Sequence, residues 1–262
     1  MRPAIHPGPL PGVDTRSLRL GLRIVVLGCI AAVLSGCQGM SRVQPVSQVR
    51  VIDGSPDAPA IDIHQNASTG LYNVAFGTVS SYISVPAGEY THTVYTAGTR
   101  QQLAAVQASL LDGAQYTVLT GNTAAALQMT ILRDQSTPAP AGKIALRVLN
   151  QTTRAGAFDL YLLPAGSPLT AAVPLATRAG FGANTGYRNT PAGTYSILAF
   201  RAGSIPTIAS PLYTGAQTAY PSGAVRTLIL IDQAQRALPA GRPFGPALQI
   251  ITATDFNPAS AS

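Results

Sequence analysis

Three carboxylates that could hold a metal ion occur in one short segment of the sequence. Asp53, Asp57 and Asp62 lie within the stretch IDGSPDAPAID. Such carboxylates supply the oxygen ligands that Ca²⁺ prefers, although their spacing does not match an EF-hand loop. Aspartate beside glycine or proline is also typical of turns. We therefore predict turns and no bound metal or cofactor, and keep a weak calcium site as the alternative.

The sequence contains few side chains that could act as a general acid or base. After the N-terminal segment the only histidines are His64 and His92, and Glu89 is the only glutamate. The sequence contains neither G-x-S-x-G nor H-E-x-x-H, and GFGANTG at 180–186 has the wrong spacing for a dinucleotide-binding loop. We predict that the protein is not an enzyme and has no catalytic residues.

Tyrosine is the commonest aromatic residue, with 10 residues against 6 phenylalanines. Tyrosines in loops can stack on sugars or contact a protein partner. We select Tyr72, Tyr187 and Tyr213 as candidates for such contacts. The alternative is that these side chains lie on sheet faces and only support the fold.

The N-terminal segment predicts export and a lipid anchor. Arg16, Arg19 and Arg23 precede an apolar run at 24–33, which leads into Leu-Ser-Gly and Cys37. A basic region, a short apolar region and small residues before a break are typical of a signal peptide, here 1–36. The run is shorter than a transmembrane helix requires. LSGC resembles the bacterial lipobox, which predicts lipid attachment at Cys37 and a membrane as partner; an ordinary signal peptide with an incidental cysteine is the alternative.

Charge and cysteine content exclude two further classes of protein. Removal of 1–36, which holds four arginines and one aspartate, lowers the formal net charge from +7 to +4. The remaining arginines are scattered and Lys143 is the only lysine, so we predict no nucleic-acid partner. Cys29 leaves with the signal peptide and Cys37 carries the lipid, so the mature fold is predicted to form without a disulfide.

The chain contains an internal duplication. FGTVSSYISVPAGEY at 76–90 returns as FGANTGYRNTPAGTY at 181–195, and Arg50-Val51 returns as Arg147-Val148. Fixed offsets that grow in steps indicate two copies of one fold, with insertions in the loops of the second. The predicted boundaries run in chain order: a signal peptide 1–36, a lipidated tether 37–48, a first domain 49–135, a Pro-rich linker 136–142, a second domain 143–255 and a tail 256–262.

Local patterns in both copies predict β-strands. SQVRVID, EYTHTVYT and TYSILAFR alternate apolar and polar residues, and groups of Gly, Pro, Asn and Asp interrupt them. Several short strands in each copy predict an all-β fold of two tandem immunoglobulin-like antiparallel β-sandwiches. The sequence Leu110 to Tyr116, L-x-x-G-x-x-Y, resembles a tyrosine corner, in which the tyrosine hydroxyl bonds to upstream backbone.

The motifs of the first copy also resemble a known family. V-R-V-x-x-x-S-P-D-A-P-A-x-D at 49–62, F-G-x-x-x-x-Y-x-x-V-P-A-G-x-Y at 76–90 and L-x-x-G-x-x-Y at 110–116 resemble the DUF4397 domain of bacterial cell-envelope proteins. The second copy resembles it more loosely, because QTTRAG stands where the first copy has the SPDAP element. The resemblance implies immunoglobulin-like sandwiches and carries no agreed biochemical function.

Together these features predict a non-catalytic, lipid-anchored protein of the cell envelope that binds or organises a protein or glycan partner. Gln38, rather than aspartate, follows the lipidated cysteine, which favours the outer membrane. The alternative is a small-ligand or metal-binding lipoprotein that uses a pocket between the two domains or the aspartates Asp53, Asp57 and Asp62.

Overall fold

The computed structural model describes residues 44–66, 68–206, 209–233 and 248–258. By their internal contacts, the described residues from Pro45 onward form one compact unit. Cys37 and the predicted signal peptide therefore lie outside the described residues. Within the described part of the chain, no helix is long and apolar enough to cross a membrane.

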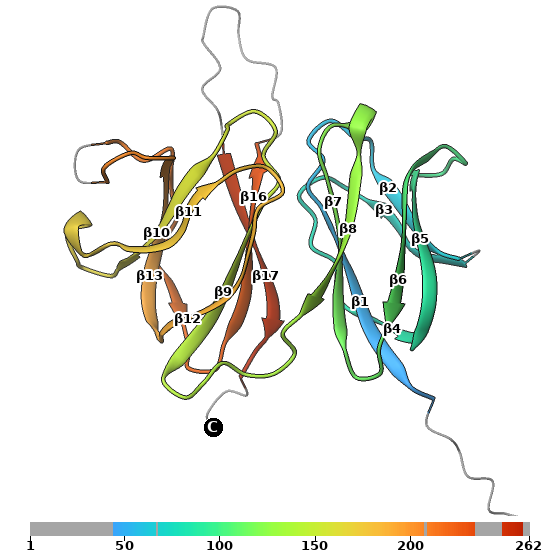
Figure 1. Cartoon of the computed structure of the whole chain (residues 1–262), viewed down its shortest axis with the longest axis horizontal. Helices are drawn as coiled ribbons and strands as arrows, with labels where there is room; N and C mark the ends of the chain where they lie inside the picture. Colours follow the sequence, from blue (N-terminus) through green and yellow to red (C-terminus); the bar gives the residue numbers. More distant parts are fainter. Residues whose placement is uncertain (1–43, 67, 207–208, 234–247, 259–262) are drawn as a thin grey trace, which may run out of the picture. The chain divides into compact units, whose positions relative to one another are not determined.

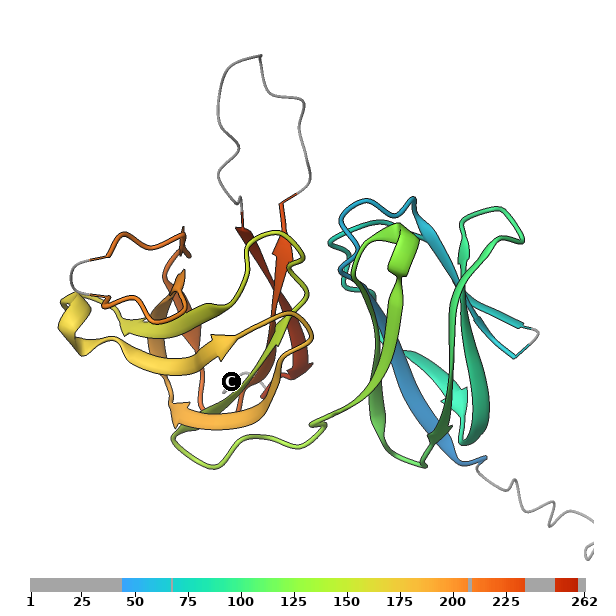
Figure 2. The same ribbon diagram turned by 45° about the horizontal axis from the view of Figure 1, so that its top comes forward.

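The first half of the compact unit is a β-sandwich of two four-stranded sheets. One sheet has the order β4-β1-β7-β8 and the other β3-β2-β5-β6. Figure 2 shows the two layers in blue to green. The strands are β1 (Val46–Asp53), β2 (Ile61–Gln65), β3 (Ser68–Val74), β4 (Ile83–Pro86), β5 (Gly88–Thr96), β6 (Gln102–Leu110), β7 (Gln115–Gly121) and β8 (Gln128–Asp134), with a short 3₁₀ helix, η2, at Ala124–Ala126.

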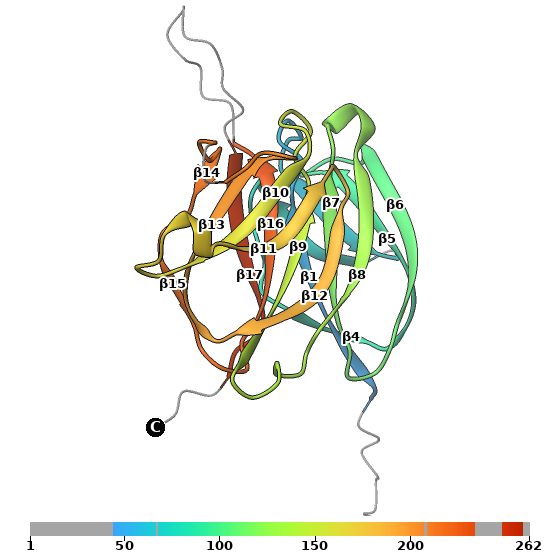
Figure 3. The same ribbon diagram turned by 60° about the vertical axis from the view of Figure 1, so that its left-hand side comes forward.

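The second half repeats this arrangement (Figure 1). Its sheets have the orders β12-β9-β16-β17 and β11-β10-β13-β14, and β15 also pairs with β13. Figure 3 shows β10, β11 and β13 together in one of them. The strands are β9 (Lys143–Asn150), β10 (Phe158–Pro164), β11 (Val173–Ala179), β12 (Asn184–Pro191), β13 (Gly193–Arg201), β14 (Tyr213–Thr214), β15 (Thr218–Tyr220), β16 (Val225–Asp232) and β17 (Leu248–Phe256), with η3 at Leu169–Ala171.

The all-β prediction of two sandwiches is confirmed, with one difference in strand direction. Most strand pairs are antiparallel, but β1 pairs with β7 in parallel and β9 pairs with β16 in parallel. A parallel pair needs a long connection between its strands. Here the whole of the opposite sheet lies in sequence between the two partners, which supplies that connection.

The repeated Pro-Ala-Gly-x-Tyr motif builds the same turn twice. The hydroxyl of Tyr90 donates to the carbonyl of Pro86 at 2.9 Å, and the hydroxyl of Tyr195 donates to the carbonyl of Pro191 at 2.9 Å. Each tyrosine thus ties the start of its strand back to the turn that precedes it. The predicted tyrosine corner is also present, because the hydroxyl of Tyr116 accepts a hydrogen bond from the amide of Leu111 at 3.1 Å.

Each sandwich has its own apolar core, and a third apolar cluster joins the two. In β1, Val49 and Val51 belong to the core of the first sandwich. Ile52 points to the opposite face of the strand, where it packs in a cluster with Leu149 and Ile229 of the second sandwich. Both faces of β1 are therefore buried, whereas its alternating pattern predicts one exposed face.

Candidate functional site

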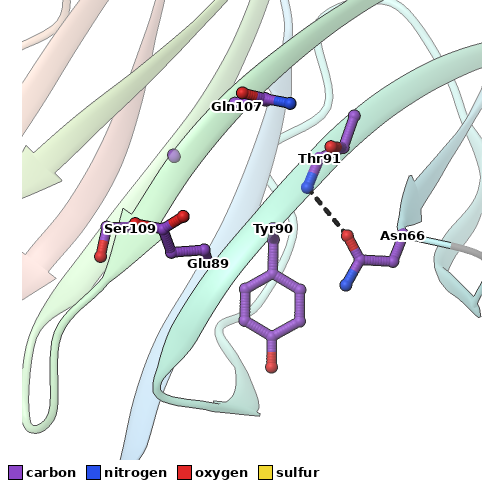
Figure 4. Close-up of a pocket in the computed structure, with 7 residues that line it drawn as sticks. Asn66, Glu89, Tyr90, Thr91, Gln107 and Ser109 are labelled. Carbon is purple, nitrogen blue, oxygen red and sulfur yellow. Dashed lines mark hydrogen bonds between the residues drawn. The ribbon is translucent and has the colours of Figure 1, made fainter.

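An open groove of about 390 Å³ lies on the first sandwich (Figure 4). Strands β5 and β6 and the turn after β2 supply its lining: Asn66, Glu89, Tyr90, Thr91, Gln107, Ala108 and Ser109. Its volume lies within the roughly 300–1,000 Å³ that small-molecule sites occupy. Size alone therefore allows a ligand here.

Strand register places the polar side chains of the groove on one face of the sheet. Glu89 pairs with Ser109, and Thr91 pairs with Gln107. Tyr90 packs against the apolar core, so its neighbours along the strand point to the opposite, outer face. The outer face thus carries a carboxylate, an amide and two hydroxyls within two neighbouring residue pairs.

Asn66 closes one end of the groove. Its backbone has a φ of +53°, a conformation that asparagine tolerates better than most residues. The backbone N–H of Asn66 donates to the carbonyl of Thr91 at 2.8 Å. The side-chain Oδ1 of Asn66 accepts from the backbone N–H of Thr91 at 2.9 Å. These two bonds fix the asparagine side chain beside β5 (Figure 4).

The second sandwich does not reproduce this set of side chains. Thr194 occupies the position of Glu89, and it pairs with Ala219 where Glu89 pairs with Ser109. A carboxylate and a hydroxyl are thereby replaced by a hydroxyl and a methyl group. The duplicated fold consequently offers a matched position that lacks the chemistry of the groove.

A smaller cavity of about 150 Å³ lies between the two sandwiches. Its lining includes Leu119 and Leu132 of the first sandwich and Leu149, Gln151 and Asn184 of the second. The sequence prediction offered a pocket between the domains as a small-ligand site. Small-molecule sites usually have volumes of roughly 300 Å³ or more, and this cavity has about half that volume. Its size therefore allows only a very small ligand.

The comparisons with known proteins identify one domain by sequence. A model of the family described as "Domain of unknown function (DUF4397)" matches residues 47–161. A DUF4397 domain is thus found at residues 47–161, which is less than half of the chain. The match begins in β1, covers the whole first sandwich and continues through β9 into β10. Among curated proteins, none matches the sequence.

Solved structures show only distant likeness. A family 26 carbohydrate-binding module from Eubacterium rectale Amy13K, solved with maltoheptaose, is 10% identical with a TM-score of 0.23, over 79% of this chain and 96% of that one. A structure titled for α-glucan binding by a streptococcal virulence factor is 9% identical with a TM-score of 0.20, over 58% and 79%. The Bacillus anthracis TIE protein is 9% identical with a TM-score of 0.20, over 80% and 43%. At this level the likeness says nothing about what this chain binds.

The three predicted metal-binding candidates of the DUF4397 domain are not brought together. Asp57 accepts from the amide of Ala124 at 2.8 Å, and Asp62 accepts from the amides of Asn73 and Gly98. Asp159 in the second sandwich makes the same pair of backbone contacts as Asp62. Among the residues that the structure describes, no group of three or more His, Cys, Asp or Glu side chains could hold a metal ion.

Asp53 is the unusual member of that trio. Its Oδ1 accepts from the amide of Ser55 at 3.0 Å and from the hydroxyl of Thr120 at 2.9 Å, while its buried Oδ2 has no hydrogen-bond partner. Burial raises the pKa of Asp53 to about 6, against the lowering effect of these two bonds. In the second sandwich Asn150 takes its place, and its Nδ2 donates to the carbonyl of Ala179 at 2.8 Å.

The two histidines lie apart from any carboxylate cluster. His92 is fully buried in the first sandwich, neither ring nitrogen has a hydrogen-bond partner, and burial lowers its pKa. His64 stacks edge-on with Tyr95 at 4.7 Å between ring centroids. Tyr161 and Phe200 form the corresponding edge-on pair in the second sandwich, at 5.7 Å.

The three candidate tyrosines have different environments. Tyr72 is 70% exposed on β3 and is available for contact. Tyr213 packs against the core of the second sandwich. Tyr187 lies beneath a buried arginine, because the guanidinium carbon of Arg147 sits 4.6 Å from its ring centroid. Only Tyr72 therefore retains the accessibility that a binding role requires.

Sequence reasoning missed a buried ionic network that involves Arg50 and Arg147. Arg50 is 1% exposed and donates to Asp255 and to the hydroxyl of Thr117. Burial lowers the pKa of Arg50, but the carboxylates of Asp255 and Asp134 outweigh it, so the pKa lies above its ordinary value. The signal was present in the sequence, since both copies place an arginine between apolar residues of a buried strand.

Proposed function

We propose that the protein is a non-catalytic, lipid-anchored module of the cell envelope that binds a glycan through the groove of its first sandwich. The observation that carries this proposal is the polar lining of the groove by Glu89, Thr91, Gln107 and Ser109 on two paired strands. Such a mixture of donors and acceptors suits a ligand that presents many hydroxyl groups.

The character of the groove favours a glycan over a protein partner. A stable protein interface buries roughly 800 Å² on each partner and is usually centred on aromatic or apolar anchors. The side chains that line the outer face of the groove are polar. Tyr72 is the exposed aromatic side chain of β3 and does not line the groove. A short oligosaccharide requires less area and more hydrogen bonds.

The composition of the groove also supports a binding role rather than catalysis. Glycoside hydrolysis usually needs a pair of carboxyl groups on either side of the scissile bond. Glu89 is the one carboxylate among the residues that line the groove. His92, the histidine closest in sequence, is buried in the sandwich.

Binding is tested with the soluble mature chain and purified envelope glycans, namely muropeptides and core oligosaccharides of lipopolysaccharide, by calorimetric titration. We expect Glu89→Ala with Gln107→Ala to weaken binding by roughly tenfold or more, because two hydrogen-bonding side chains are lost. Thr194→Ala, at the matched position of the second sandwich, should leave the affinity unchanged. Equal binding by all three proteins, or no binding of any glycan, would refute the proposal.

Membrane attachment is the second part of the proposed function, and it rests on the sequence LSGC, which ends at Cys37 and resembles a lipobox. A Cys37→Ser variant should move from the detergent phase to the aqueous phase in a detergent phase separation. We further propose that the anchored protein resides in the outer membrane, because Gln38 follows the cysteine. Density-gradient separation of the membranes tests this; recovery with the inner membrane would refute it.

A further inference from the structure

Two arginines and two aspartates meet between the sandwiches and are almost completely removed from solvent. The side chains of Arg50, Arg147, Asp134 and Asp255 are at most 2% exposed. Arg50 and Asp134 belong to the first sandwich, and Arg147 and Asp255 belong to the second. Buried charges are tolerated only when partners of opposite charge and hydrogen bonds satisfy them.

The contacts of this network are reciprocal. Arg50 donates from Nη2 to Asp255 and from Nη1 to the carbonyl of Thr254. Arg147 donates from Nη2 to Asp134 at 2.5 Å and from Nη1 to the carbonyl of Arg133 at 3.2 Å. Each arginine therefore binds the last aspartate of the opposite sandwich and the carbonyl of the residue that precedes it.

The supporting contacts inside each sandwich are duplicated as well. The Nε of Arg50 donates to Thr117 at 2.9 Å, and Thr117 donates to Asp134 at 2.6 Å. In the second sandwich, Thr227 accepts from the Nε of Arg147 at 3.0 Å and donates to Asp255 at 2.7 Å. Each threonine thus orients one arginine and one aspartate of its own sandwich toward the other.

Aromatic and apolar groups complete the repeated pattern. Arg50 lies over the ring of Tyr82 at 4.7 Å, as Arg147 lies over Tyr187 at 4.6 Å. Ile52 of β1 and Leu149 of β9 hold equivalent positions two residues after these arginines, and both belong to the shared apolar cluster. The two faces therefore present the same charged residues, and apolar residues of similar size, at equivalent positions.

A surface that pairs with an equivalent surface through reciprocal contacts is the mark of an isologous interface, in which residue i contacts j and j contacts i. We propose that the β4-β1-β7-β8 face is a self-complementary docking surface whose partner is a second copy of the same repeat. The interface between the two sandwiches of this chain then corresponds to the interface that a single repeat would form in a homodimer. In such a homodimer Arg50 of each copy would pair with Asp134 of the other copy.

Cleavage of the connecting segment tests the docking without disturbing either face. A protease site is inserted between Ser136 and Thr137, in the segment between β8 and β9, and the cut chain is analysed by size exclusion and sedimentation. We expect the two halves to remain associated. Arg147→Met in the cut chain should weaken the association by roughly 30-fold or more, since Asp134 then loses its ion pair with the other half and keeps only Arg50 of its own half. Arg188→Met, which removes an exposed arginine of the same sandwich, is the matched control.

The self-complementarity is tested with the first half, separated from the cut chain in denaturant and then refolded. A folded homodimer that dissociates when Arg50→Met is introduced supports the proposal. A half that regains its circular dichroism only when the second half is added back would refute the self-complementarity, because a second copy of the same repeat then fails to cover this face. Halves that separate after cleavage, or a folded first half that stays monomeric and does not bind the second, would overturn the proposal.

Discussion

The Nη2 atom of Arg147 lies 2.5 Å from the Oδ1 atom of Asp134, although the two residues belong to different sandwiches and both side chains are buried. Arg50 and Asp255 form the corresponding pair in the opposite sense. Each face carries one arginine and one aspartate, and each arginine pairs with the aspartate of the other face. The repeated arginine holds the two copies together as well as contributing to each strand.

Removal of one member of this network should be strongly destabilising. We expect Arg147→Met to lower the free energy of unfolding by roughly 2–5 kcal/mol, because Asp134 then loses its closer arginine partner and keeps only Arg50, at 3.5 Å. Urea denaturation followed by circular dichroism measures the loss. Arg188→Met, on an exposed position of β12, should change stability by no more than roughly 0.5 kcal/mol.

Replacing both Arg147 and Asp134 separates the energy of their ion pair from the cost of burying each charge. Arg147→Met combined with Asp134→Leu should cost clearly less than the sum of the two single changes, since no buried charge is left alone. A double-mutant cycle by urea denaturation gives the coupling energy. Strict additivity would mean that the two side chains do not interact energetically in solution.

Asp53→Asn should stabilise the protein at neutral pH. The folded state raises the pKa of Asp53 from 3.8 to about 6 through burial, so the folded chain binds a proton more tightly than the unfolded chain. The stability from this group is present below pH 3.8 and is lost as pH rises through about 6, to a total of roughly 3 kcal/mol. Asparagine carries no charge and can donate as Asn150 does.

Melting temperatures from pH 4 to pH 8 measure the effect at Asp53. The variant should melt higher than the natural chain at pH 7.5, and the difference should shrink toward pH 4. Asp57→Asn is the matched control, because the carboxylate of Asp57 accepts its hydrogen bond from Ala124 in a solvent-exposed turn. A constant difference across this range would contradict the raised pKa.

His92→Ile should remove an acid-sensitive group from the first core. Burial lowers the pKa of His92, so the unfolded chain binds a proton more readily than the folded chain. The stability of the natural chain is then full above the unfolded pKa of roughly 6.5 and is lost as pH falls below it. Ile197 holds the equivalent place in β13, which indicates that isoleucine fits.

Guanidinium denaturation at pH 7.5 and pH 5 tests the histidine. The variant should gain more relative to the natural chain at pH 5 than at pH 7.5. His64→Ile serves as a comparison on β2. If the natural chain and the His92 variant lose equal stability between the two pH values, then His92 does not titrate as its burial predicts.

The Pro-Ala-Gly-x-Tyr turns should contribute equally to both sandwiches. Tyr195→Phe removes the hydrogen bond from its hydroxyl to the carbonyl of Pro191, and Tyr90→Phe removes the matching bond to Pro86. Each change should lower stability by roughly 0.5–1.5 kcal/mol with no change of fold. Calorimetry gives both values, and a loss in only one of the two variants would show that the turns are not equivalent.

The groove illustrates which parts of a site local patterns can predict. Glu89 is conspicuous in the sequence as the sole glutamate, but a single carboxylate does not by itself indicate a binding face. Its neighbours Gln107 and Ser109 lie on another strand, and only the register of β5 with β6 places them beside it. No local pattern specifies that register, so the groove could not be assembled from the sequence.

Alternation, glycine and proline predict the all-β fold, the two copies and their turns, because these features act through local backbone geometry. The sequence also places Arg50 and Arg147 at equivalent positions. The folded chain is needed to show that these arginines face Asp255 and Asp134 across two sheets, and that the second face of β1 is buried. Burial and charge pairing depend on which surfaces meet, and residues far apart in the chain meet only once the sheets have formed.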